Sequence, residues 1–371
     1  MRKWILLTMV VLLALSGMVA ACAPPPPPEP EATEPPAPEA TATTPPPPEA
    51  TEPPEAECTA LVGMVSDVGG IDDASFNQNT WEGLVMAEEE LGVCSRFIES
   101  QAQADYEKNI TEFAEQDYDL IITVGFLLGD ATAKMAAEYP DISFGIVDFA
   151  YAPGIPNVEG IVFATDQAAF LSGYLGAYWA HTQDPDDPQC GYVAGMQIPT
   201  VEIFVAGHDA GIKYYNEQHD ANVQWKGVYV GDFEAPDEGK IQGNSLIDEG
   251  VDVIYGIGGK TGNGGLTAAK ERGKWGVGVD VDQYFTLPNE KDILITSTMK
   301  RLDNAVFGTV ESLLEGEFAG GGVYVGTLEN TGVGLAPFHD FEGEIPDEIV
   351  RELNEIAIGI INGSIDTGWE E

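Results

Sequence analysis

The sequence predicts an α/β protein with two doubly wound lobes, each built on a parallel sheet, joined by a hinge. Short apolar strands alternate with helices of roughly 10–15 residues, a pattern typical of parallel sheets covered on both faces. The alternation pauses at a long helix near 167–181 and then restarts, which indicates a second lobe. The 314 residues after the first 57 also suit two lobes of roughly 150 residues each.

The strands and helices follow one another in two series. In the first, strands are expected at 61–65, 96–98, 120–124, 142–147 and 161–163, and helices at 75–91, 105–116 and 130–138. In the second, helices are expected at 167–181, 201–216, 238–249 and 266–272, and strands at 191–194, 223–230, 251–257 and 276–279. We assign lobe I to 58–162 plus 286–318 and lobe II to 163–285 plus 319–371. Doubly wound folds bind ligands at the carboxyl ends of their strands, so a site is expected where the lobes face each other.

Residues 1–22 have the layout of a bacterial lipoprotein export signal. Arg2 and Lys3 precede an apolar stretch at 4–15, and small residues lead to Cys22. A stretch of about a dozen residues is shorter than the roughly 20 that a spanning helix needs. An ordinary secretory peptide and a short membrane anchor are the alternatives. We expect lipid to be attached at Cys22 and to hold the protein on the extracytoplasmic face of the cell membrane.

Residues 23–57 read as a spacer behind that anchor. This segment contains 15 of the 25 prolines and no lysine, arginine or aromatic residue. Such a composition cannot bury enough apolar surface to offset the entropy of ordering, and its prolines favour extended polyproline II. The sequence therefore predicts a disordered tether rich in proline and glutamate.

The net charge of −46 limits the classes of partner. A polyanionic surface repels phosphate backbones, so nucleic acid is not expected to bind. We interpret the charge as a solvated acidic surface, and we expect a monomer.

The cysteines and histidines indicate a disulfide but no metal or cofactor site. Cys58 and Cys94 begin the first two expected strands, and parallel neighbours start at the same sheet edge, which favours a Cys58–Cys94 bond in an exported protein. Cys190 is then free and buried. The four histidines are scattered without the spacing of metal ligands.

The turn at 66–78 is the most specific segment of the chain. It reads Ser-Asp-Val-Gly-Gly-Ile-Asp-Asp-Ala-Ser-Phe-Asn-Gln and lies between a strand and a helix. Asp73 or Ser75 can cap that helix, which would aim Phe76 and Asn77 into the cleft. A capped helix with Phe76 in the core is the structural alternative. No G-x-G-x-x-G occurs here, so the turn is not a dinucleotide fingerprint.

This turn resembles the signature of the basic-membrane-protein family, the substrate-binding lipoproteins of ABC importers. Further segments resemble the family in the same order: 144–148, 168–174, 195–199 with Phe204 and 207–211, Gly-Val-Asp-Val-Asp-Gln at 278–283, and 296–300. The resemblance runs from about residue 60 to the C-terminus. It implies a type I periplasmic-binding-protein fold that captures a ligand, expected to be a purine nucleoside, and delivers it to an ABC permease.

The resemblance also implies site residues. In the family, the base lies between two phenylalanines, one from each lobe, and Phe76 and Phe204 occupy these positions. The ribose hydroxyls are held by an aspartate paired with a lysine, which correspond to Asp280 and Lys300. His208 departs from the family, which usually has an aromatic or apolar residue there, and this departure bears on base selectivity.

Three more positions complete the implied ligand-binding set. Asp67 and Asn77 would contact the ribose or base from the first lobe, and Asp148 the base edge. The glycine-rich segment 256–265 contains Gly-Lys-Thr, the end of a phosphate-binding loop, but the first glycine of that motif is replaced by Ile254. We therefore expect backbone groups near Gly258 to approach the ligand instead.

Other functions have less support in the sequence. A sugar or riboflavin receptor on the same fold is the main alternative. An extracellular nucleoside hydrolase is a weaker one, because the chain has no G-x-S-x-G elbow and no metal ligands. A surface adhesin with a decayed pocket is a third. We expect a binding protein and not an enzyme.

Overall fold

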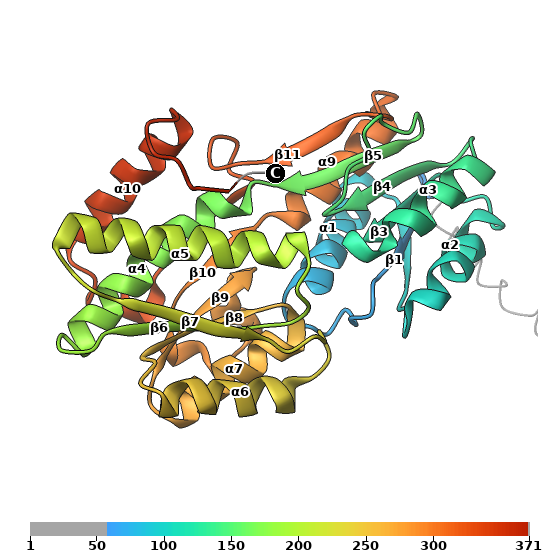
Figure 1. Ribbon diagram of the computed structural model, residues 1–371. Helices are drawn as coiled ribbons and strands as arrows, with labels where there is room; N and C mark the ends of the chain where they lie inside the picture. Colours follow the sequence, from blue (N-terminus) through green and yellow to red (C-terminus); the bar gives the residue numbers. More distant parts are fainter. Residues whose placement is uncertain (1–57, 370–371) are drawn as a thin grey trace, which may run out of the picture. The chain divides into compact units, whose positions relative to one another are not determined.

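The computed structural model describes residues 58–369, and the expected signal, tether and lipidated Cys22 lie outside these residues. The described part contains two six-stranded sheets with helices packed against them (Figure 1). The fold prediction is confirmed: both sheets are dominated by parallel pairs and are doubly wound. No helix among residues 58–369 is long and apolar enough to cross a membrane.

The first sheet has the strand order β11-β5-β4-β3-β1-β2, and every neighbouring pair is parallel. Its strands are β1 (Leu61–Val65), β2 (Cys94–Ile98), β3 (Leu120–Val124), β4 (Ser143–Val147), β5 (Val158–Phe163) and β11 (Val323–Gly326). Helices α1 (Phe76–Leu91) and α9 (Leu302–Glu315) pack into one apolar cluster with this sheet, and α2 (Tyr106–Ala114) and α3 (Gly129–Glu138) into another. All five residues of the central strand β3 are buried.

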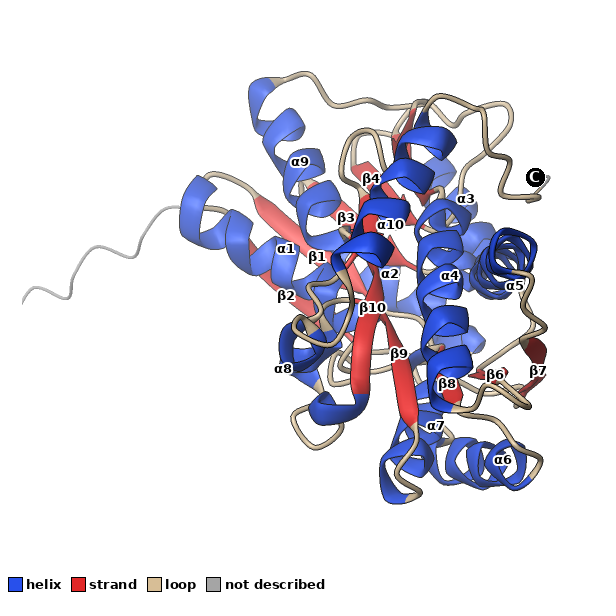
Figure 2. Cartoon of the chain, turned by 90° about the vertical axis from the view of Figure 1, so that its left-hand side faces the viewer, coloured by secondary structure: helices blue, strands red, loops and turns tan. Residues whose placement is uncertain are grey.

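The second sheet has the order β12-β10-β9-β8-β6-β7. Its strands are β6 (Gln189–Ala194), β7 (Gln224–Tyr229), β8 (Val253–Ile257), β9 (Trp275–Asp280), β10 (Leu294–Lys300) and the short antiparallel β12 (Val333–Leu335). Helices α4 (Thr165–Gln183), α5 (Pro199–His219) and α10 (Asp347–Ile361) share one apolar cluster with it. Helices α6 (Pro236–Asp248) and α7 (Gly259–Glu271) share another, and the short α8 (Gln283–Thr286) follows β9. Figure 2 shows helices flanking the strands of this lobe.

The lobes exchange strands near the C-terminal end, where the structure differs from our expected boundaries. Strand β10 lies within the 286–318 range assigned to lobe I, yet it pairs with β9 in the second sheet. Strand β11 lies in the range assigned to lobe II, yet it pairs with β5 in the first. Helix α9, between them, packs on α1 of the first lobe. The chain therefore crosses between the lobes after β5, after β10 and after β11, and these crossings form the hinge.

The helix expected at 266–272 begins earlier than the sequence predicts. Helix α7 starts at Gly259, so most of the glycine-rich segment 256–265 is helical. The glycines serve close packing between helices α6 and α7: a Cβ atom on Gly264 would lie 2.1 Å from the carbonyl oxygen of Pro236, and one on Gly239 would lie 2.0 Å from that of Thr261. A side chain at either position would push the two helices apart.

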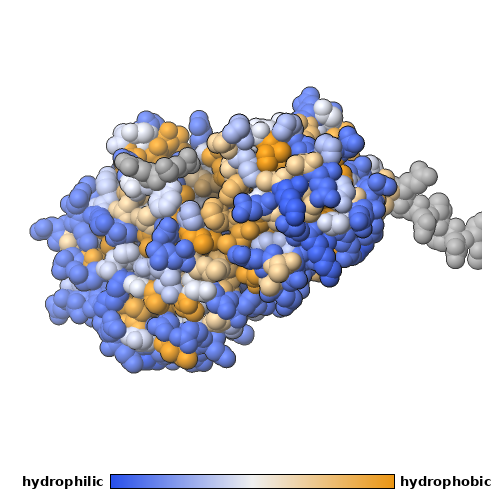
Figure 3. All heavy atoms as spheres, turned by 45° about the vertical axis from the view of Figure 1, so that its right-hand side comes forward, coloured by the Kyte–Doolittle hydropathy of each residue, from blue (hydrophilic) through white to orange (hydrophobic). Residues whose placement is uncertain are grey.

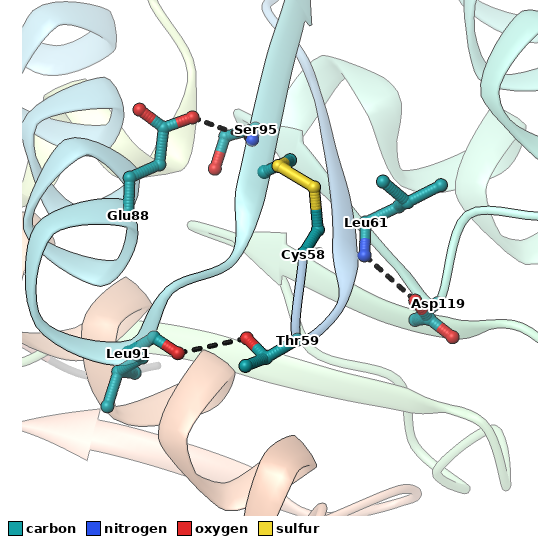
Figure 4. Close-up of a disulfide and its surroundings, with 8 residues drawn as sticks. Cys58, Thr59, Leu61, Glu88, Leu91, Ser95 and Asp119 are labelled. Atoms are coloured by element: carbon teal, nitrogen blue, oxygen red, sulfur yellow. Dashed lines mark hydrogen bonds between the residues drawn. A yellow bond between two sulfur atoms is a disulfide. The ribbon is translucent and has the colours of Figure 1, made fainter. Parts of the chain in front are cut away.

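A disulfide joins Cys58 to Cys94, the pairing that the sequence favours (Figure 4). It links the start of the described chain to the first residue of β2, and the backbone N–H of Thr59 donates to Gly92 O at 3.0 Å beside it. Cys190 is free and buried, and burial raises the pKa of its thiol. Figure 3 shows hydrophilic residues over most of the face that it draws, in keeping with the acidic composition.

Candidate functional site

A cavity between the two lobes brings together all eight residues that the sequence singles out for ligand binding. It holds about 560 Å³ of empty space, counting the part that is open to solvent. The eight are Asp67, Phe76, Asn77, Asp148, Phe204, Gly258, Asp280 and Lys300. They lie at the last residues of strands, in the loops that follow strands, or in the first two turns of the next helix, where doubly wound folds place their ligands.

Three aromatic rings surround the ammonium group of Lys300 at the end of β10. Its Nζ lies 4.9 Å from the ring centroid of Phe76, 5.2 Å from that of Phe163 and 5.6 Å from that of Phe204. Phe76 is the first residue of α1 and Phe204 lies in α5, so the two lobes each contribute a ring to the cavity. These apolar faces suit a flat ring system, and the charge gives them a polar neighbour.

Lys300 forms an ion pair with Asp148. Its Nζ lies 2.7 Å and 2.6 Å from the two carboxylate oxygens, and the two side chains are 2% and 9% exposed. Asp148 directly follows β4 in a left-handed conformation, with φ of 61°. The pair therefore connects the second sheet to the first. This partner differs from our interpretation, in which Lys300 pairs with Asp280.

Asp280 ends β9 and also has a left-handed backbone, with φ of 66°. Its carboxylate accepts a hydrogen bond from the hydroxyl of Ser75, which belongs to the other lobe. Burial raises the pKa of Asp280 to about 6, although the charge of Lys300 and the Ser75 hydrogen bond both lower it. This carboxyl group therefore titrates near neutral pH while it faces the cavity.

Asp73 lines the cavity and caps the helix that carries the cavity residues of the first lobe. Its carboxylate accepts from the backbone N–H groups of Ser75, Asn77 and Gln78 at 2.9, 2.9 and 3.2 Å, and so caps the start of α1. Of the two capping residues that we considered, Asp73 has this role, while the Ser75 side chain bonds to Asp280. The cap fixes the orientation in which Phe76 and Asn77 enter the cavity.

Asn77 has one buried side-chain oxygen without a hydrogen-bond partner. Its Nδ2 donates to Asp67 at 3.3 Å and to Asp73 at 3.2 Å, whereas its Oδ1 is buried without a hydrogen-bond partner. Asp67 also accepts from Gly69 N–H at 3.1 Å, and burial raises its pKa to about 7. A buried unpaired oxygen is costly, so a ligand that donates to Asn77 Oδ1 would relieve this cost.

The loop at Gly258 contributes backbone to the cavity wall. Gly258 and Gly259 have φ of 85° and 60°, a conformation that favours glycine. A Cβ atom on Gly258 would lie 3.0 Å from Gly195 N, a close contact with backbone, so a larger residue would strain this turn. Lys260 does not line the cavity: its Nζ lies 2.7 Å from Asp72 and 2.9 Å from Glu234. The lysine of the Gly-Lys-Thr motif is therefore paired with carboxylates and does not face a phosphate.

His208 lies outside the cavity, in the core of the second lobe. Its ring stacks on those of Tyr255 and Trp225, with centroids 4.2 Å and 4.9 Å away, and its Nδ1 lies 3.0 Å from Ser172 Oγ. Burial lowers its pKa to about 3. The departure that we connected with base selectivity is therefore a neutral core residue that does not line the cavity.

Sequence reasoning missed several lining residues. The largest side chains among them are Phe126 and Phe233, and the others include Asp73, Ile198, Thr200, Val201, Glu234 and Ile257. Phe126 follows the end of β3 and Phe233 follows the end of β7. Aromatic residues that come two to four positions after a predicted parallel strand were the signal that could have identified both. Among residues 58–369, no cluster of three or more His, Cys, Asp or Glu side chains could hold a metal ion.

The Bmp family, described as PnrA-like ABC transporter substrate-binding proteins, matches residues 60–365 of the chain. Three relatives support the match. A CD4+ T-cell-stimulating antigen of Listeria monocytogenes is 33% identical over 322 residues, covering 82% of this chain and 87% of the antigen. An ABC transporter nucleoside-binding protein of Lactococcus lactis is 30% identical over 316 residues, covering 80% and 87%. An uncharacterized lipoprotein of Pyrococcus horikoshii is 31% identical over 340 residues, covering 82% of each chain.

A solved structure supports the same assignment. The chain resembles an ABC transporter solute-binding protein of Aeropyrum pernix K1 with a TM-score of 0.77 and 30% identity, over 83% of this chain and 92% of that one.

Proposed function

The chain belongs to the Bmp family of PnrA-like ABC transporter substrate-binding proteins, and we propose that its ligand is a purine nucleoside bound between the two lobes. The relative from Lactococcus lactis is named for nucleoside binding, which supports this ligand class. We further propose that the protein is anchored by lipid on Cys22, because the relative from Pyrococcus horikoshii is named as a lipoprotein and residues 1–22 have the matching signal. Its partner in the membrane would be an ABC permease, and the protein would work as a monomer without enzymatic activity.

The observation that carries the nucleoside proposal is the pair of phenylalanines from opposite lobes. Phe76 and Phe204 both line the cavity, and the ammonium of Lys300 lies within 5.6 Å of each ring centroid. A base stacked on an aromatic face gains about 1–3 kcal/mol. Since each lobe supplies one ring, a base would contact both rings only after the lobes close, which couples capture to closure.

The polar groups at the same place support a ribose. Asp280 can accept from a sugar hydroxyl, and the ammonium of Lys300 can donate to one. Asn77 Oδ1 offers a further buried acceptor. A free base would leave the acceptors for the sugar unmatched, and a nucleoside monophosphate would bring its phosphate among Asp67, Asp73 and Asp280. We therefore expect nucleosides to bind more tightly than either.

Ligand released from the purified protein tests the proposal. The protein is denatured, and the released small molecule is identified by mass spectrometry. Calorimetry then compares inosine, guanosine and adenosine with their free bases, ribose and nucleoside monophosphates. A released nucleoside, and affinity at least tenfold higher for it than for its base, are expected. A released sugar or flavin would replace the nucleoside proposal with the alternative receptor, and equal affinity for base and nucleoside would refute the ribose assignment.

A further inference from the structure

The lysine of the Gly-Lys-Thr motif lies where the two lobes meet outside the ligand cavity. Lys260, near the start of α7, belongs to the second lobe, and its Nζ lies 2.7 Å from Asp72 Oδ1 of the first lobe. The same Nζ lies 2.9 Å from Glu234 Oε2 of its own lobe. A single ammonium therefore bridges carboxylates on both sides of the cleft.

The surroundings of Lys260 are acidic on both sides. The groove that Lys260 lines also contains Asp72 and Glu99 from the first lobe, and Asp232 and Glu234 from the second. Lys260 is the cation among the residues that line this groove. Without it, closure would bring two pairs of carboxylates toward each other, and like charges would oppose the closed state.

The segment that Lys260 holds leads directly into the binding site. Side chains of the second lobe also donate hydrogen bonds to the backbone of this segment. Asn263 Nδ2 donates to the carbonyl of Asp73 at 2.9 Å, and Thr286 Oγ1 donates to that of Ala74 at 2.8 Å. Gln283 Nε2 donates to the same Ala74 carbonyl at 3.2 Å. Two residues later, Phe76 enters the cavity.

We propose that Lys260 is an electrostatic latch, a positioning residue that holds the 72–74 segment of lobe I against lobe II and so favours the closed form. It does not line the ligand cavity, and its effect on affinity is indirect. A contact that forms only on closure lowers the free energy of the closed form, and ligand affinity rises with the closed population. The lysine of the Gly-Lys-Thr motif therefore favours closure of the lobes and does not bind phosphate.

Three variants of Lys260 test the latch, each in the full chain kept in detergent. Lys260→Gln removes the attraction and should weaken nucleoside binding about two- to fivefold, the effect of an exposed ion pair. Lys260→Glu adds repulsion and should weaken binding about tenfold, mainly through faster release. The exchange Asp72→Lys with Lys260→Asp should recover most of the affinity. Lys240→Gln is the matched control, because Lys240 pairs at 2.7 Å with Glu271 inside the second lobe. It should leave binding unchanged.

The salt dependence of the affinity shows whether the charge at position 260 attracts or repels the other lobe. Because a nucleoside is neutral, salt acts on closure and not on the ligand's own charge. Screening should weaken binding by the wild type, whose latch is attractive, and strengthen binding by Lys260→Glu, whose cleft is repulsive. A Lys260→Glu variant with wild-type affinity and the same salt dependence would overturn the latch.

A distance measurement separates this inference from the nucleoside proposal, on which the affinity measurements rest. Spin labels are attached at Glu89→Cys in α1 and Asp237→Cys in α6. Pulsed electron paramagnetic resonance then measures the distance between the two lobes in ligand-free protein. Lys260→Glu should shift the population toward longer distances, and Lys240→Gln should not. An unchanged distance distribution in Lys260→Glu refutes the latch whatever the ligand is. If the distance distribution shifts in Lys260→Glu but the wild-type protein binds no nucleoside, the latch is supported and only the nucleoside proposal is refuted.

Discussion

The ammonium of Lys300 lies 2.6 Å from a carboxylate oxygen of Asp148, and this ion pair joins the second sheet to the first inside the ligand cavity. Lys300 ends β10, and Asp148 follows β4. Both side chains are almost completely buried, so each charge depends on the other. The pair thus belongs both to the binding site and to the contact between the two lobes.

Removing one charge of this pair should destabilise the protein even without ligand. We expect Lys300→Gln or Asp148→Asn to cost up to about 3–5 kcal/mol, because each leaves a buried charge without its partner. The loss should be smaller where opening of the lobes lets water reach the remaining group. Urea denaturation of ligand-free protein measures it. The double variant should lose less than the sum of the single variants, since it leaves no lone charge. Additive losses would show that the two residues do not act as a pair.

The two phenylalanines should differ in what their replacement costs. Phe76 is only partly buried, at the edge of the first lobe's apolar cluster, whereas Phe204 is 4% exposed and packs inside the cluster of the second lobe. Phe76→Ala should therefore weaken nucleoside binding by a factor of about 5–150, the loss of one stacking face, with little change in the melting temperature. Phe204→Ala should weaken binding similarly and also lower the melting temperature, because it leaves a cavity in the core.

Calorimetric titrations beside thermal melts of ligand-free protein make this comparison. The double variant should lose less binding free energy than the sum, since one missing ring already weakens closure. Unchanged affinity in Phe76→Ala, in protein that binds nucleoside, would mean that this ring does not stack on the base.

The order of strands and helices along the chain could be predicted because it depends on local sequence pattern. The exchange of strands between the two sheets could not. The continuous apolar residues of β3 and β8 mark central parallel strands, and both are fully buried. Strands β10 and β11 were not among the strands expected from the apolar pattern. Which sheet each joins depends on its pairing: β10 pairs with β9 in the second sheet, and β11 pairs with β5, more than a hundred positions earlier, in the first. Sequence periodicity carries no information on that choice.

The site could be predicted as a set of residues but not as a set of contacts. Motifs identify Asp148, Asp280 and Lys300, and all three line the cavity. Which carboxylate pairs with Lys300 depends on how the two lobes meet, and the structure selects Asp148. Similarly, the glycines before and after Lys260 suggest a phosphate loop, yet they allow two helices to pack closely. Contact partners across a cleft are set by tertiary structure.

Lowering the pH toward 5 should strengthen the contribution of Asp67 and Asp280 to folding stability but weaken ligand binding. Burial raises the pKa of Asp67 from 3.8 to about 7 and that of Asp280 from 3.8 to about 6. The folded protein therefore binds more protons than the unfolded chain between these values, and the contribution of both groups to stability falls as pH rises from about 4 to 7. Binding should instead weaken below about pH 6, where Asp280 loses the carboxylate that accepts from the ribose.

Thermal melts of ligand-free protein and calorimetric titrations, both between pH 5 and 8, test this contrast. In Asp67→Asn the melting temperature should vary less with pH than in the wild type, because the substituted group no longer titrates. In Asp280→Asn binding should be weak and nearly independent of pH. Affinity that rises on acidification would contradict the assigned role of the Asp280 carboxylate.

The disulfide should stabilise the first lobe without contributing to ligand binding. Cys58 and Cys94 are 36 positions apart, and closing a loop of that length in the unfolded chain is expected to stabilise the fold by about 3–4 kcal/mol. The bond lies where β1 and β2 begin, whereas the cavity lies beyond the carboxyl ends of the strands. Cys58→Ser with Cys94→Ser should therefore lower the free energy of unfolding, measured with urea, and leave the nucleoside dissociation constant within about twofold of the wild type. Cys190→Ser is the control for loss of a buried thiol without loss of a crosslink. A large loss of affinity in the double variant would show that the bond also supports the site.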